Sequence, residues 1–277
     1  MVFGDVADGL LLAAGARRLC SMAAEGLLTR LRCALRVSVA RDLFVLVLFT
    51  VLSLGMTYPL VCRLSTAVLG PPSDSFEYVW KLWWFKHALL DLHRSPLTAP
   101  DVFAPYGYPL ALSETTVANT MLGLPLTVAF GEVTAYNLLA LASFTLSGWG
   151  AYRLLQEWAA DAWAGVLAGI VFAFSPYRLA HLGAGHLPLM GTQWLPLALL
   201  SAERLIRGRG RCWPWALALG GTFALFALSS WWYAYLGGLF LTAYIVVRSK
   251  GEGSRVRSAH VSAPRSSEIS MVAPRRT

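Results

Sequence analysis

Charged residues are scarce in this chain. Aspartate, glutamate, lysine and arginine make up 14% of its 277 residues, whereas 56% are hydrophobic. A soluble domain has roughly 25% charged residues, so this composition argues against one and predicts that lipid surrounds most of the protein. The eleven tryptophans and ten tyrosines agree with that prediction, because both residue types collect at membrane interfaces.

Several sequence motifs are also missing. The four cysteines, Cys20, Cys33, Cys62 and Cys212, form no CxxC pair, which argues against a zinc site and a disulfide framework. No P-loop or dinucleotide fingerprint occurs, so a nucleotide-linked donor is not expected. The basic tract at 207–211 suits a short cytoplasmic loop, and no nucleic acid partner is predicted. We find no internal repeat of the kind that builds many transporters.

The hydrophobic runs predict an all-α, polytopic membrane helix bundle of about six spans. The first run, residues 43–62, carries no charge. At about 1.5 Å per residue it is long enough to cross a hydrocarbon core of about 30 Å. Residues 117–131 are predicted to form a helix embedded in the outer leaflet without crossing it. The remaining spans are expected at 133–152, 162–178 and 187–202, and as a hairpin within 213–247 that turns near Ser229 and Ser230.

The distribution of basic residues predicts the orientation. With these spans, 18 lysines and arginines lie on the inner face and five on the outer face. If residues 117–131 also crossed, the split would be seven inside and 16 outside, contrary to the positive-inside rule. We therefore expect an integral protein of the plasma (inner) membrane, with both termini cytoplasmic and one long outer loop at 63–135.

The chain divides into three predicted regions. Residues 1–42 mix leucines with six arginines and are expected to form a cytoplasmic amphipathic helix or a loosely ordered segment. Residues 43–247 form the membrane domain. Residues 248–277 are rich in Ser, Arg, Gly and Pro, which predicts a disordered cytoplasmic tail.

The outer loop opens with the acidic and aromatic segment Asp74–Trp80. Helical spacing of the aromatic residues, with Glu77 and Lys81 four residues apart, predicts an interfacial helix over 75–92. Asp74 is the candidate catalytic residue, because a carboxylate at the membrane boundary could act as general base on an acceptor hydroxyl. The alternative is that Asp74 or Ser73 only caps this helix.

The candidate substrate-binding residues lie on this helix and on a second segment, and they are Tyr78, Lys81, Trp84, Arg178, His181 and His186. Pro176 predicts that a re-entering outer loop carries the last three. Cationic donors there could hold a phosphate leaving group, or Arg178 could extend to lipid phosphates. The two histidines are five residues apart, which does not place two metal ligands on one helical face, so no metal site is predicted. Trp80, Trp83 and Trp84 could stack on a sugar ring or form an interfacial belt.

The order of these parts resembles the N-terminal half of a GT-C membrane glycosyltransferase, the superfamily that includes protein O-mannosyltransferases and lipid A aminoarabinose transferases. That family opens its outer loop with a motif of the type Asp-Glu-x-x-Tyr. Here Asp74 and Tyr78 match the motif, while Ser75 replaces the second acid. Short segments also resemble those of bacterial multi-span proteins similar to GT-C enzymes, namely residues 103–107, 172–178 and 193–197.

The resemblance implies a membrane glycosyltransferase with a polyprenyl-phosphate sugar as donor and a glycan, lipid or protein acceptor at the outer face. It also implies that Asp74 is the catalytic base. We expect no cofactor, with a divalent metal left open. GT-C proteins usually continue through more spans, so a truncated enzyme and a shorter relative with another role are both open. The competing hypothesis is a non-catalytic scaffold, or a subunit of a lipid or polymer transporter. The absence of charge within the spans at 43–62, 133–152, 162–177 and 213–247 argues against transport.

Overall fold

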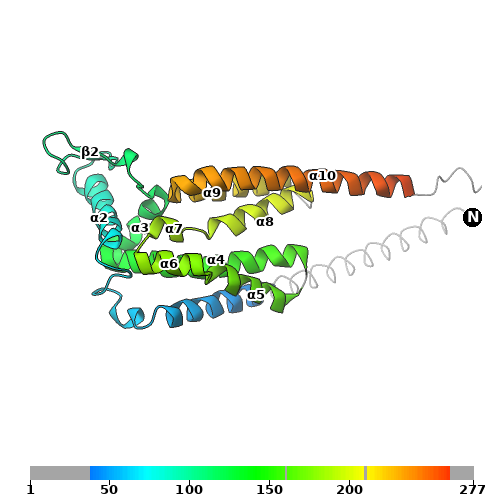
Figure 1. Cartoon of the computed structure of the whole chain (residues 1–277), viewed down its shortest axis with the longest axis horizontal. Helices are drawn as coiled ribbons and strands as arrows, with labels where there is room; N and C mark the ends of the chain where they lie inside the picture. The colour runs from blue at the N-terminus through cyan, green and yellow to red at the C-terminus, as the bar shows by residue number, and fades with distance from the viewer. Residues whose placement is uncertain (1–37, 160, 209–210, 263–277) are drawn as a thin grey trace, which may run out of the picture. The chain divides into compact units, whose positions relative to one another are not determined.

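The computed structural model describes residues 38–159, 161–208 and 211–262, and nearly all of their regular structure is helical (Figure 1). The chain divides into two compact units, residues 1–48 and 49–277, and the helix Ser38–Met56 runs across the boundary. The first unit is described only from residue 38, where this helix begins. The prediction of an amphipathic or loosely ordered segment therefore falls, for residues 1–37, outside the described residues.

The second unit begins with a mixed segment and continues with long helices. The mixed segment contains η1 (Leu60–Arg63), α2 (Asp74–Lys86), η2 (His87–Asp91), β1 (Thr98–Ala99), β2 (Tyr108–Pro109), η3 (Leu110–Leu112) and α3 (Val117–Phe130). The helices that follow are α4 (Glu132–Trp158), α5 (Ala162–Ala173), α6 (Pro176–Ala184), α7 (Leu187–Met190), α8 (Trp194–Ile206), α9 (Cys212–Ser229), η4 (Tyr233–Gly237) and α10 (Gly238–Ser262). The two short strands pair antiparallel, with Thr98 opposite Pro109 and Ala99 opposite Tyr108.

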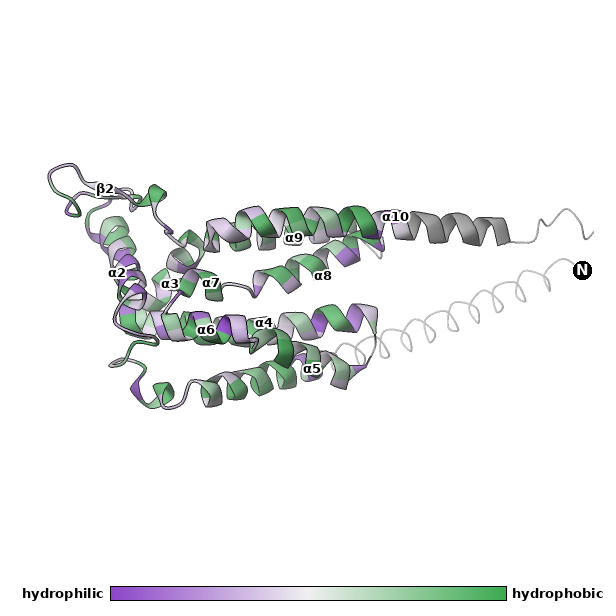
Figure 2. Ribbon diagram, viewed as in Figure 1, coloured by the Kyte–Doolittle hydropathy of each residue, from purple (hydrophilic) through white to green (hydrophobic). Residues whose placement is uncertain are grey.

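Three segments in the described part of the chain are long and apolar enough to cross a membrane. They are Ser38–Met56, Ala162–Ala184, which joins α5 and α6, and Cys212–Ser229, which is α9. Figure 2 shows hydrophobic residues along most of α9. Side chains on its surface such as Trp213 and Leu217 are 62% and 66% exposed, as expected of a helix whose surroundings are lipid and not water. The predicted all-α class is confirmed, and membrane insertion of these helices agrees with their length and composition.

The two helices predicted for the outer loop are both present. α2 and η2 together cover 74–91, where a helix over 75–92 was expected. α3 covers 117–130 with Pro125 inside it, and it is apolar but too short to count among the three candidate spans. In Figure 1, α2 runs crosswise to α4, α8, α9 and α10. The helix also breaks at the predicted place, because α9 ends at Ser229 and Ser230 has an extended backbone.

Three local predictions differ from the structure. Arg178 and His181 lie on helix α6 and not on a loop, because Pro176 occupies the first turn of that helix, where a missing N–H costs nothing. The run 187–202 is divided into α7 and α8 by residues 191–193. α10 includes residues 248–262, for which the sequence predicted no regular structure, because adding residues to an existing helix is far easier than starting one.

The buried core lies where α2 meets the long helices. α4 packs against α5 and α8, and α3 packs against both α2 and α4. One apolar cluster joins α2, α4 and α7 through residues that include Leu82, Tyr136, Phe144 and Met190. A second cluster joins α2 to the β1–β2 hairpin through residues that include Trp84, Phe85 and Leu110. These clusters fix the position of α2, whose first residue is Asp74.

Candidate functional site

Asp74 is the first residue of α2, and its carboxylate is directed at a histidine from a distant part of the chain. Asp74 Oδ2 lies 2.9 Å from His186 Nε2, and the two side chains are 48% and 32% exposed. Ser73 holds the N-cap position, but its side chain makes no capping hydrogen bond. The alternative that these residues serve only to cap the helix is therefore not supported.

His186 also contacts a second histidine. Its Nδ1 lies 2.8 Å from Nδ1 of His181, and the His181 ring meets the Tyr177 ring edge-on with 4.4 Å between centroids. A carboxylate beside Nε2 of His186 favours a proton on that nitrogen, because it would repel a lone pair there. With both rings neutral, His186 Nδ1 then accepts from His181 Nδ1, and the unprotonated nitrogen of His181 is Nε2. The three side chains thus form one polar chain, Asp74, His186 and His181.

A close backbone contact at Gly185 brings His186 to Asp74. Gly185 ends α6 in the left-handed conformation, with φ of 75°, and a Cβ placed there would lie 2.8 Å from Cβ of Ser75. Gly70 packs against the other side of Gly185 just as closely. Only glycine combines this backbone conformation with this approach at little cost, so the sequence Gly185-His186 places the histidine next to the start of α2.

Two polar side chains of α4 hold the loop that leads into α2. The buried Asn137 amide donates to the carbonyls of Leu64 and Ala67 at 2.8 and 2.7 Å, and its oxygen accepts from Leu69 N at 3.1 Å. The hydroxyl of Tyr136 lies within hydrogen-bond distance of the carbonyls of both Leu69 and Gly185. A single pair of adjacent residues therefore positions both segments from which Asp74 and His186 extend. Neither was identified from the sequence, where they are two polar residues within an apolar run.

Arg178 is enclosed in the helix bundle. It is 1% exposed, and its Nη2 donates to Ser143 Oγ at 2.7 Å and to the Met190 carbonyl at 3.0 Å. The guanidinium also lies 4.2 Å from the ring centre of Phe144. This burial is inconsistent with the alternative that Arg178 extends to lipid phosphates. Its Nε and Nη1 are buried and have no partner among the described residues, so two donors remain for an anion or water if the surroundings open.

Lys81 is also buried, and it neutralises a neighbouring carboxylate. Its Nζ lies 2.6 Å from Glu77 Oε1, donates to the Glu114 carbonyl at 2.8 Å, and lies 4.9 Å from the ring centre of Tyr78. The predicted pair four residues apart is confirmed, but Lys81 is 1% exposed and does not face solvent. Burial, and then the carboxylates of Glu114, Glu77 and Asp74, raise the pKa of the Tyr78 phenol, which keeps this hydroxyl protonated.

The three tryptophans of α2 have different surroundings. Trp84 is 1% exposed, and its indole N–H donates to the Pro96 carbonyl at 2.8 Å, so it anchors the hairpin segment to α2. Trp83 lies parallel to the His87 ring, with 5.0 Å between centroids. Trp80 borders a cavity. Of the three, Trp80 therefore has the position best suited to contact a ligand.

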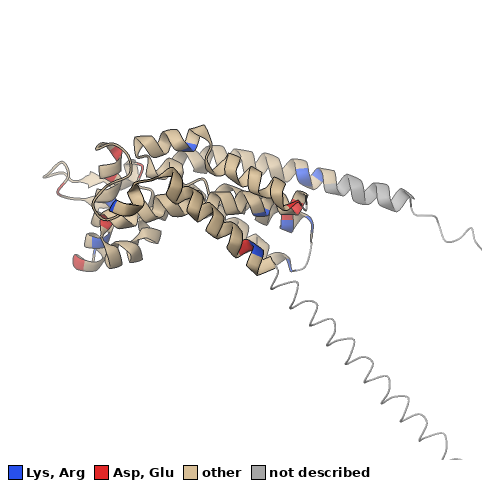
Figure 3. Ribbon diagram, turned by 90° about the horizontal axis from the view of Figure 1, so that it is seen from below, with Lys and Arg blue, Asp and Glu red and all other residues tan. Residues whose placement is uncertain are grey.

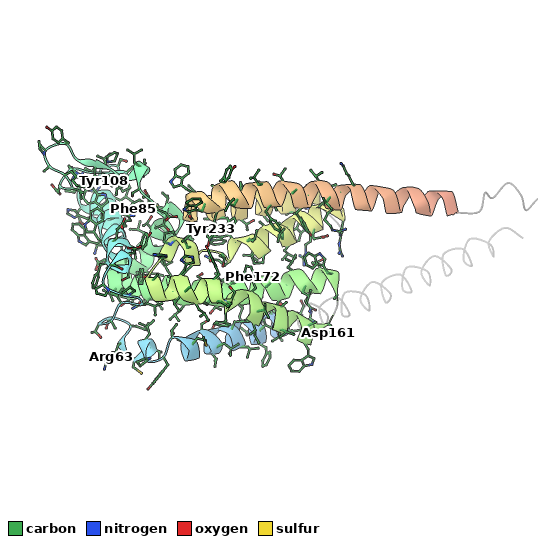
Figure 4. All side chains as sticks on the ribbon, viewed as in Figure 1. Arg63, Phe85, Tyr108, Asp161, Phe172 and Tyr233 are labelled. Atoms are coloured by element: carbon green, nitrogen blue, oxygen red, sulfur yellow. The ribbon has the colours of Figure 1, made fainter. Side chains whose placement is uncertain are left out.

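Two cavities flank the acidic residues at this end of the unit. One, of about 270 Å³, is mostly apolar and lies between the loop at Glu114 and the break between α9 and η4, where the Ser230 hydroxyl donates to the Glu114 carboxylate. The other, of about 360 Å³, lies between α2 and the β1–β2 hairpin and is lined by Glu77 and aromatic side chains. In Figure 4, Phe85, Tyr108 and Tyr233 lie at this end, whereas Asp161 lies at the opposite end.

No group of three or more His, Cys, Asp or Glu side chains in the described part of the chain is arranged to hold a metal ion. In the contact from Asp74 to His186 to His181, each ring nitrogen that could bind a metal faces another side chain, except His181 Nε2. The site therefore fits proton transfer or hydrogen bonding better than metal binding.

Comparison of this chain with protein-family models, curated proteins and solved structures gives no significant match. The function is therefore argued from the residues themselves.

Proposed function

We propose that this chain is an integral membrane protein with six spans, both termini in the cytoplasm, and residues 63–135 on the outer side. The three apolar segments provide half of these spans. α4, the α7–α8 pair and α10 provide the others. α4 is 27 residues long, about 40 Å, which exceeds the core of about 30 Å. Charged residues gather toward the ends of the helices and are few between them, as this arrangement requires (Figure 3).

The function that the site supports best is a transferase of the GT-C type, which moves a sugar from a polyprenyl phosphate to an acceptor at the outer membrane face. In this reaction an acceptor hydroxyl attacks the anomeric carbon of the sugar. The bond from that carbon to the phosphate oxygen breaks, and the lipid phosphate leaves with the bonding electrons. The acceptor proton passes to the Asp74 carboxylate. A base positioned in this way raises the rate by 10² to 10⁴-fold in typical enzymes.

The observation that carries this proposal is the contact of Asp74 with His186, and of His186 with His181. A carboxylate that only stabilised α2 would not need a partner from a segment so far along the chain. The histidine orients the carboxylate, because its Nε2 lies 2.9 Å from Asp74 Oδ2. Arg178 donates to the Met190 carbonyl at the end of α7, the helix that follows His186. Its Nε and Nη1 nitrogens carry N–H groups suited to an anion.

The test is transfer of radiolabelled glucose, mannose or N-acetylglucosamine from the corresponding polyprenyl phosphates, measured in membranes that contain the full chain. Asp74→Asn keeps the shape of the side chain and removes the base, so it should lower the rate on the order of 10²-fold or more. Asp91→Asn is the matched control, because Asp91 makes a similar pair with His87, 2.7 Å apart, in the same outer segment. Full activity of Asp74→Asn, or equal loss in both variants, would contradict the proposal.

The second candidate is a non-catalytic scaffold or transporter subunit, and one observation favours it. Lys81 and Arg178, two of the predicted substrate-binding residues, are each 1% exposed and are held by internal contacts. In a scaffold both serve only to hold the outer segment together. Absence of transfer with every polyprenyl-phosphate donor, together with tight association with partner proteins, would favour this candidate.

A further inference from the structure

The cavity between α2 and the β1–β2 hairpin combines an aromatic wall with one carboxylate. Trp80, Phe103 and Tyr108 line it together with Glu77 and Lys81, and its volume is about 360 Å³. This volume lies within the range of small-molecule sites, which starts at about 300 Å³. Phe103 is 71% exposed and meets Tyr108 edge-on at 5.5 Å, so its ring is held at the mouth of the cavity and is not part of the core.

The walls of this cavity are held in place before any ligand binds. The Trp84 indole fixes the Pro96 carbonyl, and Leu110 N donates to the Leu97 carbonyl at 2.8 Å, which closes the base of the hairpin. Phe103 has φ of 56°, a left-handed conformation that is unfavourable for a bulky residue. Such outliers cluster at ligand sites, because the surrounding structure must maintain them.

The charges around the cavity favour a neutral ligand. The buried Lys81 Nζ lies 2.6 Å from Glu77 Oε1, while the Glu77 side chain is 51% exposed and lines the cavity. The ammonium group is too enclosed to bind an anion, and the carboxylate is already compensated, so it attracts a free cation weakly. It remains a strong acceptor for hydroxyl groups. An aromatic face beside a hydroxyl acceptor fits a pyranose ring, whose C–H face packs on the indole while its hydroxyls reach the carboxylate.

We propose that this cavity binds a neutral sugar ring, stacked on Trp80 and hydrogen-bonded through its hydroxyls to Glu77. Glu77 follows Asp74 by three residues, about 5 Å along the helix axis and on the same side. A glycan held here would present its next hydroxyl to Asp74. The acceptor is then a saccharide and not a protein or a bare lipid. The assignment as acceptor rests on the proposed transferase function, whereas sugar binding itself does not.

Sugar binding is tested by saturation-transfer NMR on the full chain in lipid nanodiscs, which avoids glycoside detergents. The probes are the methyl glycosides of glucose, galactose, mannose and N-acetylglucosamine, with tetramethylammonium as the cationic comparison. We expect at least one glycoside to bind and tetramethylammonium not to bind. Trp80→Ala should weaken glycoside binding on the order of 10-fold or more, whereas Trp83→Ala, one turn away and stacked on His87, should leave it unchanged.

Two further variants guard against a folding defect, since Trp80 also packs against the cluster around Trp84. Trp80→Phe keeps a ring and should retain most of the binding. Phe103→Ala removes an exposed side chain and should weaken binding without changing the thermal midpoint. Failure of all four glycosides to bind, binding of tetramethylammonium alone, or equal effects of Trp80→Ala and Trp83→Ala would each overturn the inference.

The two proposals fail in different ways. If sugar binding depends on Trp80 but no donor supports transfer, the proposed binding site is supported and the proposed transferase function is contradicted. If transfer depends on Asp74 but Trp80→Ala leaves the acceptor KM unchanged, the transferase function is supported and the acceptor site is contradicted. Asp74→Asn should lower the transfer rate on the order of 10²-fold or more while glycoside binding persists.

Discussion

Asp74 Oδ2 lies 2.9 Å from Nε2 of His186, although Asp74 begins α2 and His186 lies between α6 and α7. Both side chains are partly exposed, and surface ion pairs contribute about 0 to 1 kcal/mol. Such a contact is too weak to explain how the loop before α2 is held against the helix bundle. The hydrogen bonds of Tyr136 and Asn137 perform that task, so the pair of Asp74 and His186 is available for chemistry.

We therefore predict weak energetic coupling between Asp74 and His186. In a double-mutant cycle with Asp74→Asn and His186→Gln, the coupling free energy of unfolding should be below about 1 kcal/mol. Thermal or denaturant unfolding in nanodiscs measures it. A coupling free energy of several kcal/mol would mean that the pair stabilises the fold. Loss of activity in Asp74→Asn could then result from unfolding and not from loss of the base.

Gly185→Ala should destabilise the contact between the end of α6 and the start of α2. The substitution forces a left-handed backbone on alanine and places its Cβ 2.8 Å from Ser75, so we expect a loss of about 1 to 3 kcal/mol. Gly183→Ala is the matched control, because a Cβ at Gly183 of the same helix meets nothing within 4 Å. That control should be neutral or stabilising by up to about 1 kcal/mol. Equal thermal midpoints for the two variants would contradict this account of the Gly185 contact.

Glu203→Gln should destabilise the packing of α10 against α8. Glu203 is fully buried and accepts hydrogen bonds from Trp158 of α4, from Tyr244 at 2.6 Å, and from two nitrogens of Arg248 at 2.6 and 3.0 Å. Removing its charge weakens its contacts with Tyr244 and Arg248, and we expect a loss of about 2 to 4 kcal/mol in the free energy of unfolding.

Glu157→Gln is the control for Glu203. Glu157 pairs with Arg204 but is 15% exposed, so its replacement should cost about 1 kcal/mol. The difference between the two variants is measured as a shift in thermal midpoint. A smaller shift for Glu203→Gln than for Glu157→Gln would show that the buried carboxylate is not the main link between α10 and α8.

Reporter fusions check the proposed topology. A reporter placed after Gly107 should lie outside, and one placed after Gly208 should lie inside. The reason is that 18 basic residues fall on the inner face and five on the outer face only if α3 does not cross the membrane. Alkaline phosphatase and a fluorescent protein give opposite signals on the two sides. The same sidedness at both positions would refute the six-span arrangement.

The sequence alone located most of the secondary structure. Hydropathy and residue spacing placed α2, α3 and the break at Ser230, because each depends on residues within one or two turns of one another. The same local reasoning was wrong at Pro176. There we predicted that the proline ends a helix, whereas a new helix, α6, begins at that residue. Proline is compatible with both positions, so the local sequence does not distinguish them.

The site depended on the tertiary structure. Asp74, His181 and His186 were candidates from their residue types, but only the packing of Gly185 against Ser75 brings the first and the last together. The burial of Arg178 and Lys81, and the choice of Trp80 over Trp83 and Trp84, likewise follow from contacts between distant segments. The sequence by itself determined which stretches are apolar helices, because that depends on each residue's own preference for lipid or water. Which polar side chains meet at their ends was decided by how those helices pack, since a contact distance is a property of two segments and not of either one.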